Sequence, residues 1–172
     1  MNHMKSYEPP NCTVPPAHSV AIIIPFRDNK EQARSHQLFI MLHFMIPILI
    51  RQNIKFQFFL ITQESFNLEF PWDLRLVTRL QIWRRRLNAL VERKKTEKGL
   101  FNRAKLLNIG FDQASKRNEF DCFMFHDVDL ILENDKAIYN CFNDSKIVWH
   151  YSGYIDKFKY RLLYQYLFGG SK

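Results

Sequence analysis

The chain has 172 residues, 47% of them hydrophobic, with sixteen phenylalanines and a formal net charge of +8. This apolar content is sufficient for one folded domain with a core, so an intrinsically disordered chain is excluded. Between Glu64 and Gly99 lie nine basic and five acidic residues, so this segment carries +4 of the net charge of +8. The rest of the chain is only mildly basic, which argues against a nucleic-acid-binding domain.

The first half of the chain predicts a lead-in, a strand, a helix and a second strand. Residues 1–18 contain four prolines and no periodicity, so we expect an irregular lead-in to a domain over 19–170. The apolar, mostly β-branched run 20–24 before Pro25 predicts a buried parallel strand. Apolar residues at helical spacing predict a helix from 30 to about 53, kinked or split at Pro47. No apolar run is long enough to predict a membrane-spanning helix.

Three further elements complete the predicted fold. The short apolar run 56–62 predicts a second strand. The helical spacing of apolar residues over 101–116 predicts a second helix, and the apolar run 120–125 predicts a third strand. This alternation of strands and helices predicts a parallel three-layer α/β sheet with right-handed crossovers.

The basic segment 64–99 contains a predicted helix over 74–95. One face of this helix is apolar and the rest is crowded with Arg and Lys; the apolar face comprises Leu76, Leu80, Trp83, Leu87 and Leu90 or Val91. Such a helix can bind a membrane surface or a nucleic acid. The more common alternative is a solvated helical insertion that packs on the domain through its apolar stripe.

Two carboxylates, Asp127 and Asp129, follow the third predicted strand directly. Carboxylate oxygens suit Mg²⁺ or Mn²⁺, and open α/β sheets bind ligands beyond the carboxyl ends of their strands. Three interpretations follow: a metal-assisted nucleotide-sugar transferase, a phosphatase with Asp127 as nucleophile, or a turn whose acids cap 134–139.

Three segments, 22–28 (IIIPFRD), 101–111 (FNRAKLLNIGF) and 122–130 (CFMFHDVDL), occur in an order that resembles the β-1,4-galactosyltransferase family, glycosyltransferase family 7. The resemblance covers about 7–63 and 100–170, so that 64–99 reads as an insertion. It implies a GT-A type, Rossmann-like fold and a Golgi-lumenal, Mn²⁺-dependent inverting transferase. The implied substrates are UDP-galactose and a glycan acceptor that ends in N-acetylglucosamine.

The resemblance also assigns roles to residues. Phe26 would face the uracil ring, Arg27 and Arg103 would contact the nucleotide's phosphates, and Asp129 would bind the metal. Asp127 would lie near the ribose. The full implied donor-binding set is Pro25, Phe26, Arg27, Phe101, Asn102, Arg103, Asp127, Val128 and Asp129.

The spacing of the cysteines leaves two alternatives equally open: a Cys122–Cys141 disulfide, or buried free thiols. Because the count of three is odd, a disulfide would leave one cysteine without a partner in this chain. The resemblance implies the disulfide. It also matches Cys12 to a family cysteine whose partner precedes this chain.

Several departures from the family pattern limit the expected activity. Asn29 stands where the family has a second arginine. The general base and the acceptor motif are expected beyond Lys172, so we expect a donor-binding half that has little activity alone and carries no membrane anchor. Leu167, smaller than the tyrosine of galactose-specific members, favours UDP-N-acetylgalactosamine, as in invertebrate relatives. The alternative is a catalytically dead nucleotide-binding or interaction module that uses the basic helix 74–95.

Overall fold

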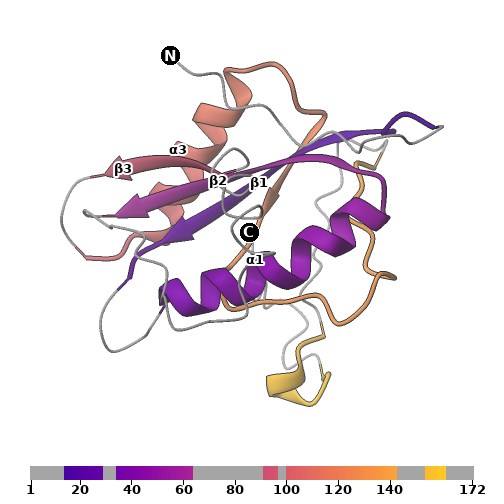
Figure 1. Cartoon of the computed structure of the whole chain (residues 1–172). Coiled ribbons are helices and arrows are strands. Elements are labelled where there is room, and N and C mark those ends of the chain that lie inside the picture. The colour runs from indigo at the N-terminus through magenta and orange to yellow at the C-terminus, as the bar shows by residue number, and fades with distance from the viewer. Residues whose placement is uncertain (1–13, 29–33, 64–90, 97–99, 143–153, 162–172) are drawn as a thin grey trace, which may run out of the picture.

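The computed structural model describes residues 14–28, 34–63, 91–96, 100–142 and 154–161, of which 91–96 are described by their backbone alone. Figure 1 shows these elements in chain order. They are β1 (Ser19–Phe26), α1 (Arg34–Arg51), β2 (Lys55–Gln63), β3 (Val91–Thr96), α3 (Arg103–Ser115), β4 (Cys122–Phe125) and the short 3-10 helix η2 (Asp156–Phe158).

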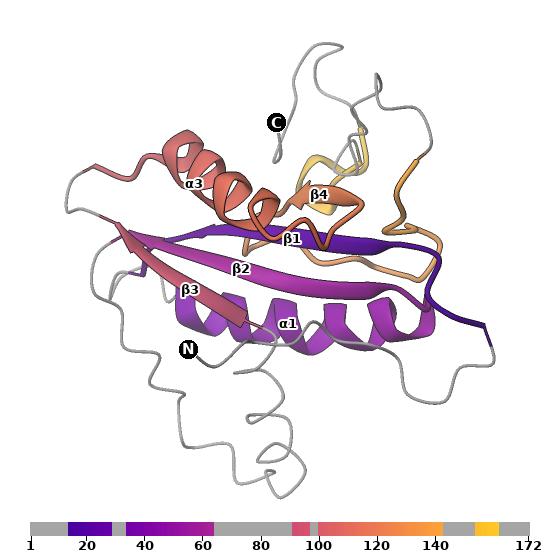
Figure 2. The same cartoon turned by 90° about the horizontal axis from the view of Figure 1, so that it is seen from above.

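The strands form one parallel sheet in the order β3-β2-β1-β4. In the register, Ile23 pairs with Phe59 of β2 on one side and with Phe125 of β4 on the other. The two helices lie on opposite faces of the sheet, α1 on one and α3 on the other (Figure 2). This arrangement confirms the predicted α/β class and the parallel three-layer order.

Each face of the sheet has its own core because successive side chains of a strand point to opposite faces. Ile22 and Ile24 pack with the apolar stripe of α1, and Ile23 packs with Leu106 and Leu107 of α3. Both faces of β1 are therefore covered, which explains its unbroken apolar sequence.

Helix α1 remains one helix across Pro47. The expected split does not occur, and residues 29–33, where the helix was predicted to begin, lie outside the described ranges. Pro47 removes one backbone donor near the helix end, and the carbonyl that loses this partner belongs to the exposed His43. In the described part of the chain, neither helix has the combination of length and hydropathy that a bilayer crossing needs.

Residues 91–96 form a strand, so the prediction of a helix over 74–95 is wrong from Val91 onward; residues 74–90 lie outside the described residues. β3 pairs in parallel with β2, from Phe58 opposite Val91 to Gln63 opposite Thr96. Its sequence, VERKKT, lacks an apolar alternation, because an edge strand is held by backbone hydrogen bonds and commonly carries charged residues. The apolar periodicity upstream therefore did not indicate where the strand begins.

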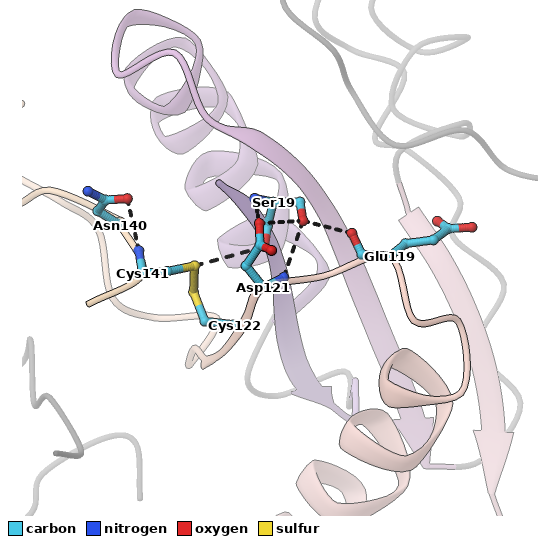
Figure 3. Close-up of a disulfide and its surroundings, with 6 residues drawn as sticks. All are labelled: Ser19, Glu119, Asp121, Cys122, Asn140 and Cys141. Atoms are coloured by element: carbon cyan, nitrogen blue, oxygen red, sulfur yellow. Dashed lines mark hydrogen bonds between the residues drawn. A yellow bond between two sulfur atoms is a disulfide. The ribbon is translucent and has the colours of Figure 1, made fainter. Parts of the chain in front are cut away.

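The Cys122–Cys141 disulfide is present, with 5.7 Å between the two Cα atoms (Figure 3). It joins the start of β4 to the segment that follows the acidic residues. Nearby, the Asp121 carboxylate accepts hydrogen bonds from the backbone and the hydroxyl of Ser19, at 2.7 and 2.9 Å. By the chain-entropy model, closing a loop of this size stabilises the fold by about 3 kcal/mol.

Candidate functional site

The candidate site lies where the carboxyl ends of β1 and β4 meet. Helix α1 follows β1 on one face of the sheet, whereas α3 precedes β4 on the other (Figures 1 and 2). A change of face between adjacent parallel strands leaves a crevice beyond their carboxyl ends, which is the usual ligand site of open α/β sheets. Arg27 follows β1 there, and Asp127 and Asp129 follow β4.

Asp127 is held by Arg103, the first residue of α3. Nε of Arg103 donates to Oδ1 of Asp127 at 2.8 Å, and an NH2 hydrogen donates to Oδ2 at 3.1 Å. The Asp127 side chain is 21% exposed. Burial raises the pKa of the Asp127 carboxyl, and the two hydrogen bonds from Arg103 oppose that rise. The bidentate pair fixes the orientation of both groups.

Asp129 is more exposed and contacts a second arginine. NH1 of Arg34, on α1, donates to Oδ2 of Asp129 at 2.8 Å. The Asp129 side chain is 47% exposed. Both carboxylates therefore bind arginines from other elements, which disfavours the interpretation that they cap 134–139; that segment is not helical.

The position of Arg103 works against local helix stability. A helix N-terminus carries a partial positive charge and favours acidic residues, yet Arg103 begins α3 directly after its cap Asn102, and α3 has no acid in its first turn. Such local conflicts are typical of functional sites, where anion binding compensates for them.

A hard divalent cation fits this chemistry. Within the described ranges no three His, Cys, Asp or Glu side chains converge as a metal cluster. Small hard cations are commonly bound through one or two carboxylates, with substrate phosphates completing the coordination, so such a cluster is not required. The exposed carboxylate of Asp129 suits that role.

The loop that carries Phe101 is held by Gln63 at the end of β2. The Gln63 amide donates to the carbonyl of Leu100 at 2.8 Å, and its oxygen accepts from the backbone of Asn102 at 3.1 Å. The Asn102 side chain in turn caps α3 by accepting from the backbone of Lys105. Phe101 lies between Leu100 and Asn102, whose backbone groups Gln63 binds, and it is 46% exposed.

Three of the sequence-predicted donor contacts are buried. Phe26 is 1% exposed and lies in the core beneath α1, so its ring does not present a face to a ligand, contrary to the expected uracil contact. Val128 is also in this core, so any contact from it would be through its backbone. Pro25 is buried at the end of β1, and Arg27 is partly exposed. Leu167, Cys12 and Asn29 lie outside the described residues.

Sequence reasoning missed three residues at this site: Arg34, Gln63 and His126. His126 is buried beside Asp127, where Nδ1 lies 2.8 Å from the Asp127 carbonyl oxygen and the ring contacts Tyr139. Burial lowers the pKa of His126 from 6.5 to about 4. A single arginine on a helix or a glutamine at a strand end carries no distinguishing sequence signal.

The burial of His126 predicts a pH dependence of stability. Between pH 6.5 and about 4, the unfolded chain binds a proton on this histidine that the folded chain does not. The free energy of unfolding should therefore fall as the pH is lowered through this window, by up to about 3 kcal/mol. Urea unfolding at a series of pH values measures this. The His126→Phe variant should show a shallower decline over the same window, and an unchanged slope would contradict the assignment.

The chain is thus an open parallel α/β protein with arginine-paired carboxylates at its switch point, which is where proteins of this class bind ligands. The family model for the N-terminal region of glycosyl transferase group 7 matches residues 1–72 and 75–142. The chain belongs to this glycosyltransferase family. The match also runs through most of 64–99, the segment interpreted above as an insertion.

The chain is similar over 95% of its length to named relatives. It is 36% identical to human beta-1,4-galactosyltransferase 2 over 165 residues and 35% identical to mouse beta-1,4-galactosyltransferase 1 over 164. It is 34% identical to the beta-N-acetyl-D-glucosaminide beta-1,4-N-acetylglucosaminyl-transferase of Lymnaea stagnalis. The chain spans 33%, 31% and 25% of these relatives' own lengths.

Two solved structures are also similar. Drosophila beta-1,4-galactosyltransferase 7 in complex with manganese, UDP-Gal and xylobiose is 27% identical with a TM-score of 0.46. Its catalytic domain in complex with xylobiose is 26% identical with a TM-score of 0.47. Each comparison covers 74% of this chain and 37% of the other.

Proposed function

We propose that this chain is the donor-binding part of a Mn²⁺-dependent inverting hexosyltransferase that uses a UDP-sugar. The observation that carries the proposal is the pair of carboxylates beyond β4, each within 2.8 Å of an arginine from a different helix. Arginines and a cation held by Asp129 together neutralise a diphosphate, which is the leaving group of such a reaction.

Each residue of the site has its own proposed role in binding the donor. Arg103, oriented by Asp127, is positioned to donate to the nucleotide, and Asp129 provides the carboxylate for the cation. Phe101 is the exposed aromatic ring at this edge, clamped by Gln63, so we assign the contact with the uracil face to Phe101 instead of Phe26. When bound, Mn²⁺ supplies a Lewis acid that offsets charge on the leaving diphosphate.

The transferred sugar and the acceptor are finer proposals. We propose galactose or N-acetylgalactosamine as the sugar and a terminal N-acetylglucosamine as the acceptor. Relatives of almost equal identity are named for galactose transfer and for N-acetylglucosamine transfer, so identity alone does not discriminate the donor. Comparative binding of the three UDP-sugars to the chain would select among them.

We also propose the Golgi lumen as the location: the Cys122–Cys141 disulfide requires an oxidising compartment, and the family resemblance implies the Golgi among such compartments. The alternative of an interaction module built on a basic helix over 74–95 is weakened, since its last residues form β3.

Calorimetric titration of the chain with UDP tests the proposal. Binding should require Mn²⁺, and Asp129→Asn should weaken it by at least about tenfold because a neutral amide is a poor ligand for a hard cation. Asp135→Asn is the matched control, since Asp135 is an exposed carboxylate of the same segment that pairs with Arg51. UDP binding that ignores both Mn²⁺ and Asp129 would refute the proposal.

A further inference from the structure

Arg34 is the one arginine in contact with the proposed metal ligand in the described part of the chain. It lies 95 positions from Asp129 in the sequence, and its NH1 group is 2.8 Å from Oδ2 of Asp129. The two side chains are 30% and 47% exposed. No motif in the sequence singles out Arg34, so its role is visible only in the folded chain.

The Arg34–Asp129 pair contributes little to folding. Pairs this exposed stabilise a protein by about 0–1 kcal/mol. Arg51, in the last turn of α1, differs: the helix dipole favours a cation there, and Arg51 contacts Asp135 through two nitrogen atoms. Stability therefore gives a reason for the position of Arg51, and an exposed pair with one nitrogen contact gives little reason for that of Arg34.

The electrostatics of Asp129 explain the position of Arg34. In the empty site Arg34 is the counter-ion of Asp129, because its NH1 group donates to Oδ2. The same positive charge repels a divalent cation at this carboxylate, so Arg34 competes electrostatically with the metal for Asp129. Since Arg34 is fixed on α1, its guanidinium stays near the carboxyl ends of β1 and β4, where the proposed diphosphate would bind.

We propose that Arg34 is a further donor-binding residue, which pairs with Asp129 in the empty site and with the donor's diphosphate in the filled site. This inference rests on the proposed function. The inference predicts two effects of opposite sign for Arg34→Gln. Without nucleotide, Mn²⁺ should bind more tightly, because a competitor for Asp129 is gone. At saturating Mn²⁺, UDP should bind about tenfold more weakly, because one charge-assisted contact is lost. A residue with a merely structural role would not produce both effects.

The experiment uses the full 172-residue chain, with Mn²⁺ alone followed by electron paramagnetic resonance and UDP binding followed by calorimetry at saturating Mn²⁺. Arg51→Gln is the matched control: it removes the other α1 arginine that pairs with an aspartate and should behave as wild type in both assays. Arg34→Lys keeps a positive charge and should fall between wild type and Arg34→Gln for UDP.

The outcomes separate this inference from the proposed function. If wild type binds UDP with Mn²⁺, and Arg34→Gln binds UDP and Mn²⁺ as tightly as Arg51→Gln does, the inference fails and the proposed function stands. Tighter Mn²⁺ binding with unchanged UDP binding would also overturn it, because Arg34 would then be a counter-ion only. If wild type takes up no UDP, both fail.

Discussion

Replacing Arg103 with methionine is expected to lower the free energy of unfolding by about 2–3 kcal/mol and to abolish most UDP binding. Methionine keeps the length of the side chain and removes both hydrogen bonds to Asp127, leaving a largely buried carboxylate without its counter-ion. The loss is below that of a fully buried pair because Arg103 is 32% exposed and Asp127 21% exposed. Urea unfolding at neutral pH measures the stability.

A double variant distinguishes two causes of the lost stability: the unpaired buried charge of Asp127 and the loss of packing by Arg103. Arg103→Met combined with Asp127→Leu should be more stable than Arg103→Met alone, because no charge is left buried, yet UDP binding should remain weak. The penalty of the single variant should also shrink as the pH falls. Burial already raises the pKa of Asp127, and without Arg103 it rises further. A double variant no more stable than the single one would contradict this explanation.

Replacing Gly110 with valine is expected to cost about 3 kcal/mol or more, because α3 packs against the sheet at this glycine. A Cβ at position 110 would lie 2.3 Å from Cγ2 of Ile23 and 3.0 Å from Cγ1 of Ile61. Ile23 is fully buried and its β-branched side chain is stiff, so the helix must move away from the sheet. Thermal unfolding should show a clearly lower midpoint.

The control for Gly110 is the exposed residue Asn108 on the same helix. Asn108→Ala should be neutral or slightly stabilising, since alanine has the higher helix propensity. Gly110→Ala should lose stability in spite of the same gain in propensity. If Gly110→Ala is more stable than wild type, α3 does not pack as closely as described. Because α3 carries Arg103 at its first residue, its displacement should also weaken UDP binding.

The disulfide and the donor site differ in what made them predictable. Cys122 and Cys141 could not be paired from their spacing, and only the family resemblance favoured the bond that the structure contains. The acidic residues were predictable as a site because they follow an apolar strand directly, and Arg103 because it lies in a matching segment. Arg34, in contrast, contacts Asp129 across 95 positions of sequence.

Among the elements that the structure describes, the sequence alone determined the α/β class, three of the strands and the helices α1 and α3, since each depends on a run or a period of apolar residues that a short window contains. Tertiary structure decided the rest. Backbone pairing with β2 made 91–96 a strand in spite of its charged sequence, and packing beneath α1 removed Phe26 from the candidate site. It also brought Arg34 of α1 and Arg103 of α3 to the carboxylates beyond β4. These outcomes depend on which strands are neighbours, and a hydrogen bond between distant residues leaves no pattern in the residues beside either of them.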